Sequence, residues 1–298
     1  MTTKRKAAKS AKKTTAKRPA KRMSPGAAFS IATSSKKTVK QRVDAMPLIS
    51  LAATETDDDN PQAIMKVLRD TNEPVRVRLA AIETLARAAF SAEGFDSWRT
   101  DYIGTLREVS TDADAEIRQR ALGLLAREND GYVQKKLLEG LKEPDKALVP
   151  PEKALQLLSY DVHNEAYAIA RDIVNDPPNP DAKREAVRLL AADPASAPLF
   201  EKLLRDKDEL REIRQISASA LHVLKPVKLK EHAREIVLDA KDYPEIKATS
   251  LTALTQFSDE EEVAKDKTLL EKVDRLSEQA PAKVKKTARR FLTRFKKD

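Results

Sequence analysis

One short signature recurs seven times along this chain of 298 residues and constrains its fold more than any other feature. An aliphatic residue is usually followed by a basic one, with a small residue four positions after the first and a leucine eight positions after it. The first copy reads Val77-Arg78-x-x-Ala81-x-x-x-Leu85. The other copies begin at Ile117, Pro150, Ala182, Ile213, Ile246 and Val284. Successive copies start 31 to 40 residues apart, a period typical of stacked helix pairs, because one pair alone cannot bury its apolar stripe.

The signature positions share one face of a helix. At 100° per residue, positions 0, 4 and 8 lie within about 80° of arc, and the small middle residue allows a neighbouring helix to approach closely. We therefore expect the seven leucines to lie in the core and their truncation to alanine to cost about 2–5 kcal/mol each where fully buried. These leucines are Leu85, Leu125, Leu158, Leu190, Leu221, Leu254 and Leu292.

Helices are expected to alternate along most of the chain, with prolines at many of the joints between them. The signature predicts the second helix of each pair near 74–90, 114–128, 150–160, 181–192, 210–224, 244–257 and 281–297. The first helices are expected near 61–70, 98–110, 131–142, 161–175, 195–206, 227–241 and 259–279. The acidic stretches 57–59 and 259–262 precede helices, where negative charge complements the helix dipole, although such stretches could also bind a cation or a basic partner.

The pattern resembles HEAT repeats of the armadillo type, including the PBS-lyase HEAT-like group, over about residues 43–298. Two copies depart from it, since Pro151 replaces the basic residue and Ala182 the aliphatic one. The resemblance implies an all-α fold, a right-handed α-solenoid of about seven helix pairs. In this family the basic residue commonly pairs with an Asp or Asn near the turn between the two helices. The resemblance therefore points to a partial ladder through Asn72, Asp112, Asp145 and Asp208, which stand six residues before the corresponding positions.

The net charge of +9 is distributed unevenly. Residues 1–42 carry +14 with no acid, residues 281–298 carry +7, and the body between them carries −12. Residues 1–38 are also of low complexity, with too few apolar side chains to offset the entropy lost on ordering. We therefore expect two parts, a disordered Lys-rich arm at 1–38 and a HEAT-like solenoid at 39–298.

The arm resembles the Lys/Ala-rich tails of histone H1-like proteins. Its charge favours weak, non-specific, salt-sensitive binding to nucleic acid, with a Kd of order 10⁻⁴–10⁻⁶ M. Binding to anionic lipid, folding back on the acidic body, and service as an atypical transit peptide remain alternatives. The candidate polyanion-binding residues of the arm are Lys4, Arg5, Lys6, Lys9, Lys12, Lys13, Lys17, Arg18, Lys21 and Arg22. Lys286 and Arg290 on the last helix could form a second phosphate contact, or belong to a polar cap of the solenoid.

Several kinds of chemistry find no support in the sequence. With no cysteine, disulfides and thiolate metal sites are excluded. None of His163, His222 and His232 has another histidine at the spacing that places two ligands on one helix face. We expect no catalytic residue, metal or cofactor. No apolar run is long enough to cross a membrane, and we expect a cytoplasmic location, at the nucleoid if the arm binds DNA.

Opposite the apolar stripe, positions 2 and 6 of the signature carry polar side chains. In a HEAT-like stack the second helices line the concave side, so these side chains are expected to form one continuous row that binds a protein partner, with plain solvation as the alternative. The row consists of Gln119, Glu152, Gln156, Arg184, Arg188, Gln215, Ser219 and Thr252. The sequence thus favours a non-enzymatic scaffold tethered by its basic arm. The alternative is an enzyme on the same fold, either a chromophore lyase/isomerase or a DNA glycosylase using Trp98 with Asp96 and Asp101.

Overall fold

The computed structural model describes residues 23–51, 60–91, 95–161 and 164–296. These residues divide into two compact units, with the boundary between Thr100 and Asp101. All regular structure in the described residues is helical, and the predicted all-α fold of successive helix pairs is confirmed. The division at Thr100 was not predicted from the sequence, which placed residues 39–298 in one solenoid.

The first unit contains two helix pairs. Helices α1 (Pro25–Ala32) and α2 (Val39–Ala45) form the first pair, and α3 (Asn60–Arg69) and α4 (Val75–Ser91) form the second. Short 3₁₀ segments follow at η1 (Met46–Leu48) and η2 (Phe95–Trp98). Helix α2 packs on α4, and the Thr84 hydroxyl of α4 donates to the Met46 carbonyl at 3.2 Å.

Helix α1 corrects the expectation that residues 1–38 are a disordered arm. Ser24 caps α1 by accepting from the Ala27 amide, and Ala28 and Ala32 are fully buried. These two alanines are enough to hold α1 in place, because α2 packs closely against α1 and little apolar area has to be buried per residue. Residues 1–22 of the expected arm lie outside the described residues. They contain all ten of its candidate polyanion-binding residues.

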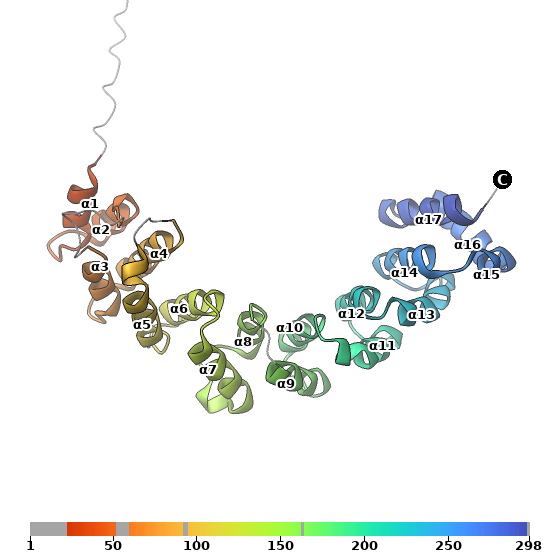
Figure 1. The fold of residues 1–298 in the computed structure, drawn as a ribbon, viewed down its shortest axis with the longest axis horizontal. Coiled ribbons are helices and arrows are strands. Elements are labelled where there is room, and N and C mark those ends of the chain that lie inside the picture. Colours follow the sequence, from red (N-terminus) through yellow and green to blue (C-terminus); the bar gives the residue numbers. More distant parts are fainter. Residues whose placement is uncertain (1–22, 52–59, 92–94, 162–163, 297–298) are drawn as a thin grey trace, which may run out of the picture. The chain divides into compact units, whose positions relative to one another are not determined.

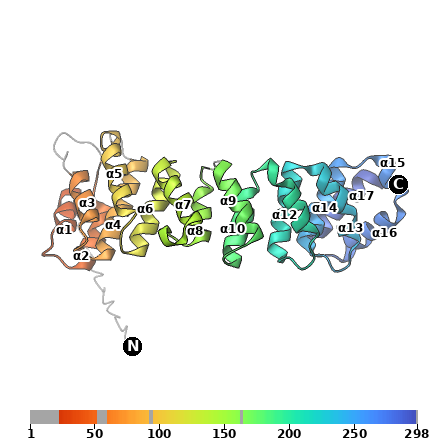
Figure 2. The ribbon, with the colours of Figure 1, turned by 90° about the horizontal axis from the view of Figure 1, so that it is seen from below.

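The second unit begins with α5 (Arg99–Val109), whose first two residues precede the division between the units. It continues through α6 to α17 as pairs in which each signature-bearing helix follows its partner (Figures 1 and 2). The first helices are α7 (Gly131–Lys142), α9 (Asn164–Asn175), α11 (Ala197–Arg205), α13 (Pro226–Leu238), and α15 (Glu260–Lys265) with α16 (Lys267–Gln279). The second helices are α6 (Ala115–Arg127), α8 (Pro151–Leu158), α10 (Pro180–Leu190), α12 (Arg211–Leu224), α14 (Pro244–Phe257) and α17 (Ala282–Phe295). Short 3₁₀ segments lie at η3 (Pro144–Lys146) and η4 (Pro194–Ser196).

The second helices of this unit form one continuous layer, with contacts from α6 to α8, α10, α12, α14 and α17 in succession. The small signature residues are buried in all seven copies, and six of the seven signature leucines are at most 4% exposed. Leu292 on the last helix is partly buried. The expected helix at 259–279 is divided at Asp266, whose carboxylate caps α16 by accepting from the Leu269 amide at 3.1 Å.

A ladder of basic residues connects successive pairs, but in a different register from the one that the HEAT resemblance implied. In three pairs the guanidinium Nε donates to the carbonyl ten residues earlier, at the end of the first helix, where helix carbonyls lack intrahelical partners. These bonds are Arg42 to Ala32 at 2.9 Å, Arg78 to Leu68 at 2.8 Å and Arg214 to Leu204 at 2.9 Å. Arg42 therefore marks an eighth copy of the signature, in which Gln41 replaces the aliphatic residue.

The acidic partner of a ladder residue comes from the next pair. Arg42 binds Glu73 through two hydrogen bonds of 2.6 and 2.7 Å, Lys183 binds Glu209 at 2.5 Å, and Arg214 binds Asp242 at 3.0 Å. Each of these acids stands five residues before the basic residue of its own pair. Two of the four expected partners show the difference in register. Arg118 donates to the backbone carbonyl of Asp112 at 2.6 Å, and Arg214 binds Asp242 of the next pair at 3.0 Å.

Candidate partner-binding surface

Five second helices of the second unit carry the predicted row of polar residues. We call the eight predicted side chains and the surface around them on α6, α8, α10, α12 and α14 the second-helix face. Gln119, Gln156, Arg188 and Ser219 are exposed, and Glu152, Arg184, Gln215 and Thr252 are half-buried. All eight therefore point away from the apolar stripe, as the helical spacing predicts.

Two neighbouring hollows bring seven of the eight together. The first, of about 340 Å³, lies over α6, α8 and α10 and is lined by Gln119, Glu152, Gln156 and Arg184, together with Pro150, Lys153, Asp181 and Glu185. The second, of about 430 Å³, lies over α10 and α12 and is lined by Arg188, Gln215 and Ser219, together with Ala191, Glu212, Ile216, Ala220 and Val223. Thr252 lines neither hollow, and its hydroxyl donates to the Ala248 carbonyl of its own helix at 2.9 Å.

The two arginines of the row are held in a network of acids that the sequence analysis did not identify. Arg188 binds Glu185 at 2.5 Å and Glu212 at 2.6 Å. Arg184 binds Asp181 and lies 3.6 Å from Glu212. The hydrogen bond that Arg184 donates to Asp181 raises the pKa of the Arg184 guanidinium above its ordinary value. Because Glu212 of α12 contacts both arginines of α10, the network connects the two hollows, and its three acids exceed its two arginines by one charge.

An apolar strip on α12 was also missed. Ile216, Ala220 and Val223 line the second hollow, and Val223 is 76% exposed. The three residues are spaced four and three apart, so they lie in line on one side of the helix. That spacing is readable in the sequence, but it is rotated from the buried stripe that the signature defines. The second-helix face thus combines an apolar strip with fixed polar groups, the composition of many binding surfaces.

Proteins similar to this chain were found among solved structures. No protein-family model and no curated protein matches it. Among solved structures, an engineered protein is 18% identical over 91% of this chain and 84% of its own length, with a TM-score of 0.47. Human deoxyhypusine hydroxylase, in complex with glycerol, is 14% identical over 80% and 96%, with a TM-score of 0.35. The complex of CpcE and CpcF of phycocyanin lyase from a Nostoc species is 17% identical over 88% and 97%, with a TM-score of 0.40. At these TM-scores the similarities assign no activity to this chain.

One group of side chains in the described part of the second unit has the composition of a metal site. Glu201 of α11 and Glu231 and His232 of α13 place their ligand atoms within 4.8 Å of one another. Their existing contacts account for the cluster, since His232 Nε2 lies 2.7 Å from Glu201 and Lys228 donates to Glu231 at 2.8 Å. The hydrogen bond from Lys228 lowers the pKa of Glu231. Both carboxylates thus have partners without an ion.

The remaining sequence candidates are dispersed. Lys286 and Arg290 are exposed on α17. Asp96 is 94% exposed and forms an ion pair with Arg99 at 3.6 Å, while Trp98 is half-buried in η2. His163 lies outside the described residues. Among the helices that the structure describes, none has the length and apolar composition needed to cross a membrane.

Proposed function

We propose that this protein is a non-enzymatic scaffold that binds a protein partner along the second-helix face. The observation that carries the proposal is the pair of neighbouring hollows over α6, α8, α10 and α12, which the network around Glu212 connects. An extended peptide segment fits such a surface, with an apolar side chain on the strip of Ile216 and Val223 and polar contacts to the charged network. No aromatic residue lines either hollow, which favours an open binding surface over the alternative of an enzyme pocket.

The apolar strip supplies the first test. Replacing Ile216 and Val223 together with glutamate is expected to reduce capture of the native partner from the host at least about tenfold, since the change would bury two unpaired charges in the interface and a loss of about 1.4 kcal/mol is tenfold. The matched control is Lys202→Glu with Arg205→Glu, at two exposed positions on α11, which is the first helix of its pair. Quantitative mass spectrometry of the captured proteins measures the effect. Equal recovery with the strip variant and with wild type would remove the second-helix face as the binding surface.

The charged network is tested separately by Arg184→Glu with Arg188→Glu. Because each arginine already holds an acid, the reversal places like charges beside Asp181, Glu185 and Glu212, and partner capture is expected to fall several-fold. A circular dichroism spectrum and a melting temperature establish that the variant remains folded. Retention of capture by a folded double variant would leave the apolar strip alone as the binding determinant.

We further propose that residues 1–22, with ten basic residues and no acid, tether the scaffold to nucleic acid, with Lys286 and Arg290 as a second contact. The structure shows how many N-terminal residues can be deleted without removing contacts of the first unit. Deleting residues 1–42 would also remove α1 and Arg42, which contribute to the first unit through Ala32 and Glu73, whereas deleting residues 1–22 leaves them intact.

The truncation is expected to remove sequence-independent DNA binding. For the full chain, the logarithm of the association constant should fall with the logarithm of the salt concentration, with a slope of up to about −9 if all ten charges meet phosphates. A filter-binding titration of both chains at several salt concentrations measures this slope. The Lys286→Gln/Arg290→Gln variant distinguishes a contribution of α17. Equal affinity with and without residues 1–22 would assign the binding elsewhere or exclude it.

A further inference from the structure

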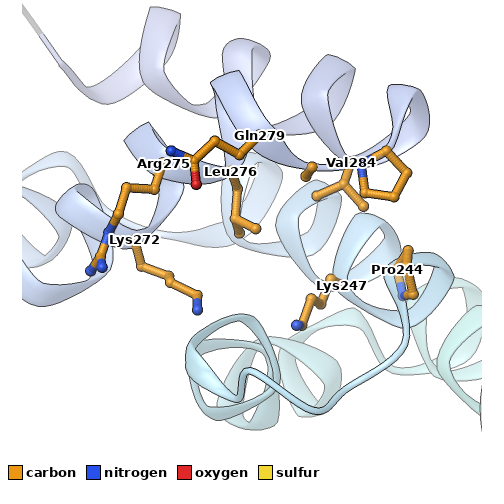
Figure 3. A pocket seen from close by; sticks show the side chains of 9 residues that line it. Pro244, Lys247, Lys272, Arg275, Leu276, Gln279 and Val284 are labelled. Atoms are coloured by element: carbon orange, nitrogen blue, oxygen red, sulfur yellow. The ribbon is translucent and has the colours of Figure 1, made fainter.

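A small hollow at the joint of α14, α16 and α17 has the composition of an anion site. Its volume is about 280 Å³, and it is lined by Pro244, Lys247, Lys272, Arg275, Leu276, Gln279, Ala280, Pro281 and Val284. Three of these nine residues are cations and none is an acid. Figure 3 shows Lys272 of α16 and Lys247 of α14 extending into the same space, with Leu276 and Val284 beside it. None of these residues belongs to the second-helix face.

Lys247 is the central residue of this hollow. It is only 7% exposed, and its ammonium, which has three protons to donate, has one hydrogen bond, to the Ala240 carbonyl at 3.3 Å. Burial lowers the pKa of Lys247, and the neighbouring charge of Lys272 lowers it further. Within the described part of the chain, the Lys272 ammonium has no hydrogen-bond or ion-pair partner. Two cations therefore share a partly enclosed space without a counter-charge lining it.

The ladder explains why the counter-charge is missing. Lys247 is the basic residue of its signature copy, equivalent to Arg42, Lys183 and Arg214. In those three steps, the acid stands five residues before the basic residue of the next copy. For Lys247 the next basic residue is Lys285, so the equivalent position is Ala280, which lines the hollow. The chain thus has a methyl group where three other steps have a carboxylate.

The acids whose charges act on Lys247, Asp242 and Asp239, already bind other cations. Asp242 binds Arg214 at 3.0 Å and Lys207 at 2.5 Å, and Asp239 binds Lys207 at 2.9 Å. Both acids favour the charged form of Lys247, so the ammonium can be retained, yet neither forms an ion pair with it. An anion from outside the chain would supply the missing ladder partner.

We propose that this hollow binds a carboxylate group of a peptide, from an acidic side chain or a chain end, with Lys247 and Lys272 as the donors and Arg275 at the rim. A carboxylate is the group that the equivalent cations hold elsewhere in the ladder. The volume is near the lower limit of ligand sites, so it suits a single anionic group and a short apolar stem against Leu276 and Val284. The site would hold a second segment of a partner, or a different partner, beyond the second-helix face.

The test uses the full chain labelled with ¹³C in its lysines. The Lys247 signal is assigned by its loss in Lys247→Gln, and the chain is titrated at constant ionic strength with a blocked tripeptide containing one glutamate. The Lys247 and Lys272 signals are expected to shift saturably. The glutamine counterpart of the peptide is expected to leave them in place. Lys272→Gln is expected to weaken binding at least about tenfold, because a charge-assisted hydrogen bond contributes about 1.5–3 kcal/mol. Lys283→Gln, an exposed position on α17 outside the hollow, is the matched control.

The variant Ala280→Asp provides an independent result. It restores the acid at the ladder position, so it is expected to shift the Lys247 signal without peptide and to abolish the response to the glutamate peptide. If this variant does not fold, the loss of peptide binding in Lys272→Gln tests the proposal on its own. Equal responses to the two peptides, or unchanged binding by Lys272→Gln, would overturn the proposal. A response to inorganic phosphate but not to the glutamate peptide would also overturn it, since the site would then be one for phosphate.

Discussion

Asp242→Ala is expected to destabilise the second unit by about 3–5 kcal/mol, because it leaves a buried guanidinium without its counter-charge. Arg214 is 2% exposed and the Asp242 side chain is fully buried. The carboxylate accepts from Arg214 at 3.0 Å and from Lys207 at 2.5 Å. Arg214 would still donate to the Leu204 carbonyl at 2.9 Å, but this hydrogen bond satisfies only one of its donors and does not neutralise its charge. Hydrogen exchange of the amides of α11, α12 and α14 measures the loss as a fall in protection of at least about a hundredfold.

An ion pair between α12 and α14 whose arginine is exposed supplies the control. Arg211 binds Glu245 at 2.5 Å, but its side chain is 52% exposed. Arg211→Ala is expected to cost less than about 1 kcal/mol, since water screens such pairs and compensates their loss. Comparable losses of protection in the two variants would mean that burial of Arg214 and Asp242 does not determine their contribution.

The Asp242 pair also gives the second unit a defined response to acid. Burial alone would raise the pKa of Asp242, but the hydrogen bonds from Arg214 and Lys207 outweigh it, and the pKa is lowered. A carboxyl with a lowered folded-state pKa contributes its full stability above the unfolded value, about 3.9. That contribution is lost as the pH falls through the folded value. The stability difference between wild type and Asp242→Ala should therefore be constant near neutrality and shrink below about pH 4, as urea unfolding at several pH values would show.

The helix pairs could be predicted because burial in a repeat fold is local in sequence. Val77, Ala81 and Leu85 lie on one side of a helix whatever the neighbouring pair does, and the structure buries all three completely. In the first pair, α1 was missed, although the predicted solenoid begins at residue 39, where α2 starts. Gln41 is polar at the first signature position, so the pattern is broken there. The burial of Ala28 and Ala32 depends on how closely α2 approaches, which composition does not reveal.

The candidate surface could be predicted in its residues but not in its interactions. Helical spacing placed Arg184 and Arg188 on the exposed side of α10, and the structure agrees. Their contacts with Glu212 depend on the register between α10 and α12, which no pattern within one helix specifies. The ladder shows the same limit, since the acid that Arg214 binds lies 28 residues ahead in the next pair. The hollow at Lys247 could be interpreted only after the structure had shown which position supplies that acid.

Leu190→Ala is expected to cost about 2–5 kcal/mol, and Leu292→Ala less than about 2 kcal/mol, although both leucines occupy the same signature position. Leu190 is fully buried in α10, between pairs on both sides, so its truncation leaves a cavity that neighbouring helices cannot readily close. Leu292 is only partly buried on the last helix, where it packs against the cluster around Phe291 and Phe295, and its loss exposes surface instead of opening a void. Urea unfolding of both variants measures the difference. Equal costs would mean that a following helix pair adds nothing to the stability that the signature leucine contributes. The apolar stripe would then be stabilised within each helix pair alone.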